Sequence, residues 1–178
     1  MVSPIIIART GLPDTITQNN LYPGVSQQRP HSLGFNGSGK APETTPEGTG
    51  VRYLLSPNDP NFPFAPSGPL YTGSGANRTQ VLPASIGSLG RNTTREPSEF
   101  NIDLAVARTF PIRERLRFEI RAEAFNFLNR TNFNGPSTAL SVQADPSTGR
   151  AVFNSPGFGL ITSAKSARFM QLVARFEF

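Results

Sequence analysis

The stretch from Glu114 to Phe127 alternates between charged and apolar side chains, and this alternation restricts the fold more than any other feature of the chain. Between positions 115 and 124 every odd position is charged and every even position is apolar. A helix would turn successive odd positions by about 200° and scatter the charges around its circumference. A strand places all of them on one face. We therefore expect a β-strand with one charged and one apolar face.

The strand is also long enough to cross a membrane. Its fourteen residues, at about 3.3 Å each, reach roughly 45 Å, whereas ordinary strands end near 17–20 Å. Tilted by about 40°, such a strand rises roughly 33 Å and crosses the apolar belt of about 25 Å on an outer-membrane barrel. Two interpretations remain open from this stretch alone. It is a transmembrane strand, or it is a long strand of a soluble antiparallel sheet with one face on a core and one in water.

Composition excludes several classes of function. The chain has no cysteine, so it has no disulfide and no thiolate metal site, and its single histidine, His31, lies between proline and serine in a loop-like segment. We therefore expect no catalytic residue, no metal site, no cofactor and no enzyme activity. The net charge is +5, but the arginines at positions 114–123 interleave with glutamates. Without a uniform basic stripe, we expect no nucleic-acid partner.

The pattern along the chain predicts three parts. Residues 1–10 contain the short apolar run Ile5-Ile6-Ile7 and are interpreted as the remnant of a barrel strand. Residues 11–99 are rich in proline and glycine and are expected to form a long extracellular loop region. Residues 100–178 carry three strands, at about 100–110, 114–127 and 167–178, with a loop at 128–166. A tight connection at 111–113 joins the first two of these strands as a hairpin.

The lengths of these connections favour the membrane interpretation. Transmembrane barrels have short periplasmic turns and long outer loops, and here the connections run long, short, long. If the turn at 111–113 is periplasmic, an aromatic girdle falls near that boundary, made of Phe110, Phe118, Phe176 and Phe178. Arg108 interrupts the apolar face, and near an interface it costs about 0–1 kcal/mol instead of about 2–4 kcal/mol at the midplane. We predict an all-β fold, an antiparallel transmembrane β-barrel segment of about four strands.

Four strands cannot close a barrel, because the smallest transmembrane barrels have about eight. An open sheet in lipid would leave unpaired backbone groups that cost several kcal/mol each. The chain also begins without a secretory signal, since Met1 is followed by no basic segment and only a short apolar run. We therefore expect the chain to be a fragment of a larger barrel.

Several motifs, in their order and spacing, resemble the C-terminal end of the Oar-like TonB-dependent outer-membrane transporters. They cover about residues 87–178 and are Gly87-Ser-Leu-Gly-Arg-Asn92, Phe100-Asn-Ile-Asp-Leu104, Arg121-Ala-Glu-Ala-Phe-Asn126, Asn132-Phe133, Phe158-Gly-Leu-Ile-Thr-Ser-Ala164 and the terminal Phe178. The chain departs from the family at Glu96-Pro-Ser98, where the family has Gly-Pro-Gly, and this changes a turn before the strand.

The resemblance implies a full-length protein in the outer membrane with a carboxypeptidase-regulatory-like domain, a plug and a 22-stranded barrel. TonB would be contacted only through N-terminal parts that this chain lacks, so the chain alone is not transport-competent. The implied partners are outer-membrane lipid and the barrel-assembly machinery. The terminal alternation is similar to the signal that this machinery recognises, and the matching positions are Leu172, Ala174, Phe176 and Phe178.

Two functional hypotheses follow. In the first, the chain is the C-terminal wall of a TonB-dependent transporter, and its charged face lines the lumen with Arg117, Glu119, Arg121, Glu123 and Arg175. In the second, it is a soluble β-rich binding module that uses its basic excess for an anionic ligand. The transported substrate does not follow from the sequence, since selectivity would lie in the plug and in loops all around the barrel.

Overall fold

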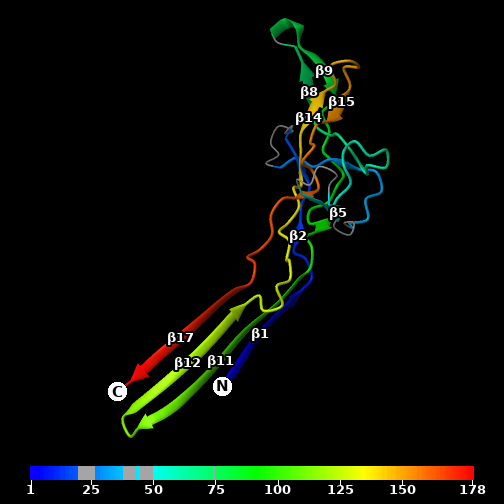
Figure 1. Ribbon diagram of the computed structural model, residues 1–178. Coiled ribbons are helices and arrows are strands. Elements are labelled where there is room, and N and C mark those ends of the chain that lie inside the picture. The colour runs from blue at the N-terminus through cyan, green and yellow to red at the C-terminus, as the bar shows by residue number, and fades with distance from the viewer. Residues whose placement is uncertain (20–26, 38–42, 45–49, 74) are drawn as a thin grey trace. The chain divides into compact units, whose positions relative to one another are not determined.

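The computed structural model describes residues 1–19, 27–37, 43–44, 50–73 and 75–178. Apart from the short 3₁₀ turn η1 (Gly75–Asn77), the regular elements in these ranges are β-strands (Figure 1). The chain divides into two compact units. The first, which we call the sheet unit, contains Met1–Gly11, Pro97–Asn134 and Ser163–Phe178. The second, the loop unit, contains Leu12–Glu96 and Gly135–Thr162.

The sheet unit is a single four-stranded antiparallel sheet. Its strands lie side by side in the order β1 (Val2–Arg9), β11 (Glu99–Arg113), β12 (Leu116–Phe125) and β17 (Phe169–Glu177) (Figure 1). Each neighbouring pair is antiparallel. Within the described residues the sheet does not close on itself, so β1 and β17 are its edge strands.

The register aligns apolar positions with apolar positions across the sheet. Val106 of β11 lies opposite Ala122 of β12, which lies opposite Leu172 of β17. Residues directly opposite in an antiparallel pair share a face. The same two pairings therefore bring the even-numbered positions of β11, β12 and β17 onto one face, and the odd-numbered positions onto the other.

The hairpin between β11 and β12 differs from the sequence prediction. The predicted connection at 111–113 is wrong, because β11 continues to Arg113 and the turn is Glu114–Arg115. The physical reason is a bulge: Pro111 pairs with Arg117, but Arg113 pairs with Leu116. The extra residue on β11 lengthens that strand before the chain can reverse.

The other strand ends also shift by a few residues. β12 ends at Phe125 and not at 127, because Asn126 has the left-handed φ of 50° that a strand cannot continue through. β17 begins at Phe169 and ends at Glu177, inside the predicted range 167–178.

The loop unit is built from very short strands. Pairs of strands are formed by β2 (Pro13–Asp14) with β10 (Thr94–Arg95), β3 (Thr17–Gln18) with β13 (Ala139–Leu140), β4 (His31–Ser32) with β7 (Phe64–Ala65), β8 (Leu70–Thr72) with β9 (Thr79–Leu82), and β14 (Val142–Ala144) with β15 (Ala151–Phe153). A three-stranded sheet combines β5 (Glu43–Thr44), β6 (Val51–Arg52) and β16 (Leu160–Ile161). The β3–β13 pair is parallel and joins the two segments of the unit.

The loop unit has its own hydrophobic core, which the sequence pattern does not indicate. Its buried members come from both segments and are Ile16, Leu54, Phe64, Leu89, Leu140 and Phe158. The Phe62 ring packs edge-on against Phe64 at 5.2 Å and against Phe158 at 5.6 Å between centroids. The sequence predicts two separate irregular loops, at 11–99 and 128–166. The structure instead packs the described parts of 12–96 and 135–162 around one aromatic cluster.

Candidate membrane and lumen faces of the sheet

The even-numbered face of the sheet is apolar, and no described residue covers it. Leu172 is 74% exposed, and of the sheet unit only Ala124 belongs to the buried hydrophobic residues. The other large apolar side chains exposed on this face are Val2, Ile6, Val106, Phe110, Ile120, Met170 and Phe176. A contiguous apolar surface of this kind marks a contact with another protein or with a membrane.

The odd-numbered face carries the five residues predicted to line a lumen. The structure brings Arg117, Glu119, Arg121, Glu123 and Arg175 onto this one face through the register of β12 with β17. Opposite charges meet across the strands, since Glu119 lies opposite Arg175. Along β12, Arg121 Nε lies 2.6 Å from Glu123 Oε1, and Gln171 of β17 donates a hydrogen bond to Glu123.

The Arg121 side chain is 50% exposed and that of Glu123 is 17% exposed, so water screens this pair, which contributes about 0–1 kcal/mol to stability. Their main effect is on solvation: the charges of β12, which alternate in sign along the strand, remain in water at little cost, whereas in hydrocarbon they would be expensive. The same face also carries exposed apolar side chains on the neighbouring strands and at the end of β12: Ile5, Ile7, Phe125, Phe169 and Val173. The arrangement suits a surface that borders an aqueous space.

The residues of the predicted assembly signal lie on the apolar face. Leu172, Ala174 and Phe176 alternate along β17 opposite apolar residues of β12. Phe178 follows the end of the strand and is almost fully exposed, at 99%. Recognition by assembly machinery stays a prediction.

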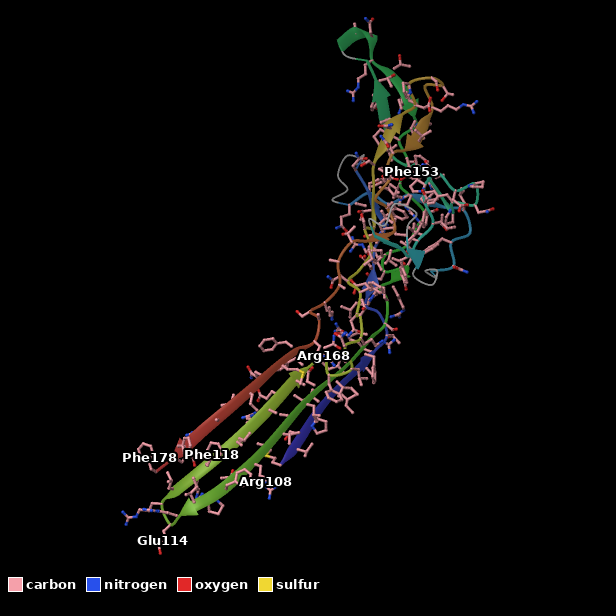
Figure 2. The ribbon with its side chains drawn as sticks, in the orientation of Figure 1. Arg108, Glu114, Phe118, Phe153, Arg168 and Phe178 are labelled. Atoms are coloured by element: carbon pink, nitrogen blue, oxygen red, sulfur yellow. The ribbon has the colours of Figure 1, made fainter. Side chains whose placement is uncertain are left out.

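An aromatic row crosses the apolar face near the β11–β12 turn. The Phe118 ring lies 4.7 Å from Phe176 and 6.4 Å from Phe110 between centroids. Figure 2 shows Phe118 and Phe178 toward the same end of the sheet as the turn residue Glu114. Arg108 also lies toward this end, and its guanidinium carbon sits 4.9 Å from the centroid of the Phe110 ring. This cation–π contact gives the one arginine on the apolar face of β11 an aromatic partner on the side of the aromatic row.

The other end of the odd-numbered face contains a polar cluster that sequence reasoning missed. A cavity of about 440 Å³ opens there. It is lined by Glu99, Asn101, Asp103, Phe125, Asn126, Asn132, Lys165, Ser166, Ala167 and Phe169. Glu99 forms ion pairs with Arg9 at 2.5 Å and with Lys165 at 2.6 Å. In the sequence, this cluster is indicated only by the asparagine-rich stretch after β12, where the alternation of charged and apolar residues ends.

Asparagine side chains in this cluster hold the chain where β12 ends. Asn126 is 8% exposed; its backbone N–H donates to Asp103 Oδ1 at 2.9 Å and its side chain donates to the Arg130 carbonyl at 2.9 Å. Asn132 Oδ1 accepts a hydrogen bond from the Phe100 backbone N–H at 3.0 Å. These bonds replace the strand ladder at the point where the left-handed Asn126 interrupts it, so the cluster has a structural role.

The described parts of both units lack a metal-binding cluster. No group of three or more histidine, cysteine, aspartate or glutamate residues there could hold a metal ion. His31 is half-buried in the loop unit, and its Nε2 lies 3.3 Å from Ser85 Oγ. In the same unit, hydrogen bonds from the Ser147 hydroxyl and from the backbone amides of Thr148 and Ser147 lower the pKa of Asp145 to about 2.

Comparisons with known proteins agree with the geometry of the sheet. A family model described as an outer membrane beta barrel domain matches residues 1–171. Searches of curated proteins and of solved structures each find no match. Within the described ranges, no helix is both long and apolar enough to cross a membrane.

Proposed function

The chain belongs to the outer membrane beta barrel domain family and is an outer-membrane protein, and from this premise we propose that it forms the C-terminal wall of a TonB-dependent receptor or transporter. In this role it supplies part of the lipid-facing surface and part of the lumen lining. The finer assignment to the Oar-like transporters rests on the resemblance of the motifs between positions 87 and 178.

The observation that carries the proposal is a sheet with two unlike faces, neither of which is covered by described residues. The apolar face would contact lipid, and the face with Arg117, Glu119, Arg121, Glu123 and Arg175 would line the lumen. A soluble binding module would need to cover the apolar face to be stable in water. The loop unit of the same chain buries its large aromatic side chains in a core. The exposed apolar face of the sheet is therefore better explained by contact with lipid than by a general lack of packing in this chain.

The open edges support the idea that further strands complete the barrel. Among the described residues, β1 and β17 each have one side without a partner strand, and in lipid each unpaired backbone group costs several kcal/mol. Additional strands would pair both edges, and the family resemblance implies a barrel of 22 strands in total. Transport would then require a plug and TonB contacts supplied by other parts of the protein, so we assign this chain a structural role without catalysis or cofactor.

The terminal strand suggests how such a wall would be inserted. Leu172, Ala174, Phe176 and Phe178 form an apolar row that ends in an exposed aromatic residue. We assign this row to recognition by the barrel-assembly machinery.

Cysteine accessibility tests the orientation of the faces. The chain has no cysteine, so Glu119→Cys and Ile120→Cys each introduce a single thiol at neighbouring positions on opposite faces. In protein assembled in the outer membrane, a membrane-impermeant maleimide should label position 119 and leave position 120 unlabelled until detergent is added. Equal labelling of the two thiols in intact membranes would refute the proposed orientation.

The TonB assignment is tested by a different observation, the DNA upstream of the Met1 codon. We expect an in-frame continuation that encodes further alternating strands, a plug and a TonB-contacting segment. If the gene encodes a barrel without a plug, the TonB-dependent role is refuted, while the proposed orientation of the two faces of the sheet remains.

A further inference from the structure

We propose that the apolar face of the sheet carries a binding site for one anionic, phosphate-bearing lipid. The site consists of an apolar groove over the C-terminal half of β12 and of two arginines, Arg130 and Arg168, beyond the groove on the side away from the β11–β12 turn. The proposal rests on the proposed function, because it requires the apolar face to lie in the membrane.

The groove arises from side-chain size. Ala122 and Ala124 of β12 are short, and the neighbouring strands on both sides carry longer side chains on the same face. The walls are Leu104 and Val106 of β11 and Met170 and Leu172 of β17, and Phe127, just after β12, also lines the groove. Because these walls are two strand spacings apart, about 9.6 Å, they leave a trough of about 370 Å³ between them. Its lining is almost entirely hydrocarbon, which suits an acyl chain.

Arg130 lies beyond the groove on the side away from the β11–β12 turn, where it contacts Phe100, four residues along β11 from the wall residue Leu104. Its guanidinium carbon is 5.6 Å from the centroid of the Phe100 ring, and Phe100 occupies an even-numbered position of β11, on the apolar face. The Arg130 backbone N–H donates to Asn126 Oδ1 at 3.0 Å, which fixes the segment that carries the arginine.

Arg168 adds a second positive charge on the same side. Its neighbours Ala167 and Phe169 both line the cavity on the odd-numbered face, so Arg168, between them, is directed to the opposite, apolar face. Its backbone N–H donates to Asn129 Oδ1 at 3.3 Å. Figure 2 shows Arg168 at the end of the sheet opposite to Arg108 and Phe178.

Neither arginine is neutralised within the described part of the chain. The described ion pairs do not include Arg130 or Arg168, and the nearby Glu99 is engaged by Arg9 and Lys165. An apolar groove with two unpaired arginines beyond one of its ends matches an amphiphile with an anionic head, and arginine binds phosphate through paired N–H donors. A second copy of this chain would present the same arginines and no counter-charge, so charge complementarity favours the lipid.

The absence of tryptophan from the chain allows a direct test with a single reporter. Met170→Trp places a fluorophore on the wall of the groove. The protein is reconstituted in bilayers that contain brominated phosphatidylglycerol or brominated phosphatidylcholine, and quenching gives the relative binding constant of the two lipids at this site. We expect phosphatidylglycerol to be preferred. Since a basic residue near the surface contributes about fivefold, Arg130→Gln and Arg168→Gln should each reduce the preference by up to about that factor.

Two controls locate the effect. Arg108→Gln removes an arginine from the same face at the other end of the sheet and should leave the preference at position 170 unchanged. A second reporter, Ile120→Trp, should report no change when Arg130 and Arg168 are both replaced.

Each other outcome overturns the proposal in a distinguishable way. Equal quenching by the two lipids at position 170, or a preference that survives Arg130→Gln with Arg168→Gln, refutes the anionic site and leaves the membrane orientation standing. Quenching at position 120 but not at 170 indicates that protein, such as a second copy, covers the groove. Absence of quenching at both positions shows that the face is not in lipid, and the proposed function fails with it.

Discussion

Arginine substitutions at two adjacent positions of β11 test the two-faced sheet quantitatively. Val106 is on the apolar face, opposite Val2 and Ala122, and Ala105 is on the charged face, opposite Ser3 and Glu123. Both changes introduce the same side chain into the same strand one residue apart. A difference between them therefore reports the environment of each face.

The position of Val106 along the strand sets the expected magnitude. It is the central residue of the 15-residue strand, so seven residues on each side extend about 23 Å along the strand and roughly 18 Å along the membrane normal. Both distances exceed half of an apolar belt of about 25 Å. Val106 therefore lies near the midplane, where an arginine costs about 2–4 kcal/mol. This corresponds to a reduction of about 30- to 900-fold in the folding equilibrium.

Ala105→Arg should leave stability nearly unchanged, because its new charge faces water opposite Glu123. The measurement is a guanidinium titration of protein folded into phospholipid vesicles, followed by protease protection. Val106→Leu serves as a control for a change of size without charge and should shift the midpoint little. If Val106→Arg and Ala105→Arg have equal midpoints, the apolar face does not contact lipid and the reasoning fails.

Three further predictions concern the loop unit. Phe158→Ala, at a residue 1% exposed in its core, should reduce the free energy of unfolding by about 3–5 kcal/mol in a urea titration, whereas Leu33→Ala at an exposed site should change it little; equal effects would contradict the described core. Gly159→Ala should lower the free energy of unfolding more than Gly149→Ala. Both positions have a positive φ, which costs a side chain about 1–2 kcal/mol. An added Cβ at position 159 would also lie 2.6 Å from a backbone carbonyl oxygen, whereas at position 149 it would meet no atom within 4 Å. Asp145, whose pKa is lowered to about 2, should stabilise its turn fully above pH 3.8 and lose this contribution as the pH falls through about 2; an NMR titration of its carboxyl carbon with a midpoint near 3.8 would contradict this.

Much of the sheet unit follows from local patterns. The strict alternation between positions 115 and 124 predicts a strand and assigns each side chain to a face, because a period of two cannot be kept on a helix. The same reasoning on the last residues places Leu172, Ala174 and Phe176 on one face, and the register confirms that they share it with Ala122 and Ala124.

The ends of the strands did not follow from the pattern, since they depend on backbone geometry. A bulge between Pro111 and Arg113 moves the turn to Glu114–Arg115, and the left-handed Asn126 ends β12. Hydrophobic alternation contains no information on either feature, because both are decided by single φ/ψ values and by the hydrogen bonds that satisfy them.

The loop unit was decided only by tertiary structure. Its core joins Ile16 and Leu54 to Leu140 and Phe158, residues that are far apart in the sequence and that have no periodic spacing. Chains without regular periodicity bury their apolar side chains according to which distant segments meet, and that choice is made by long-range packing. By contrast, the two faces of the sheet were already determined by the sequence alone, because side chains on a strand alternate wherever the strand lies.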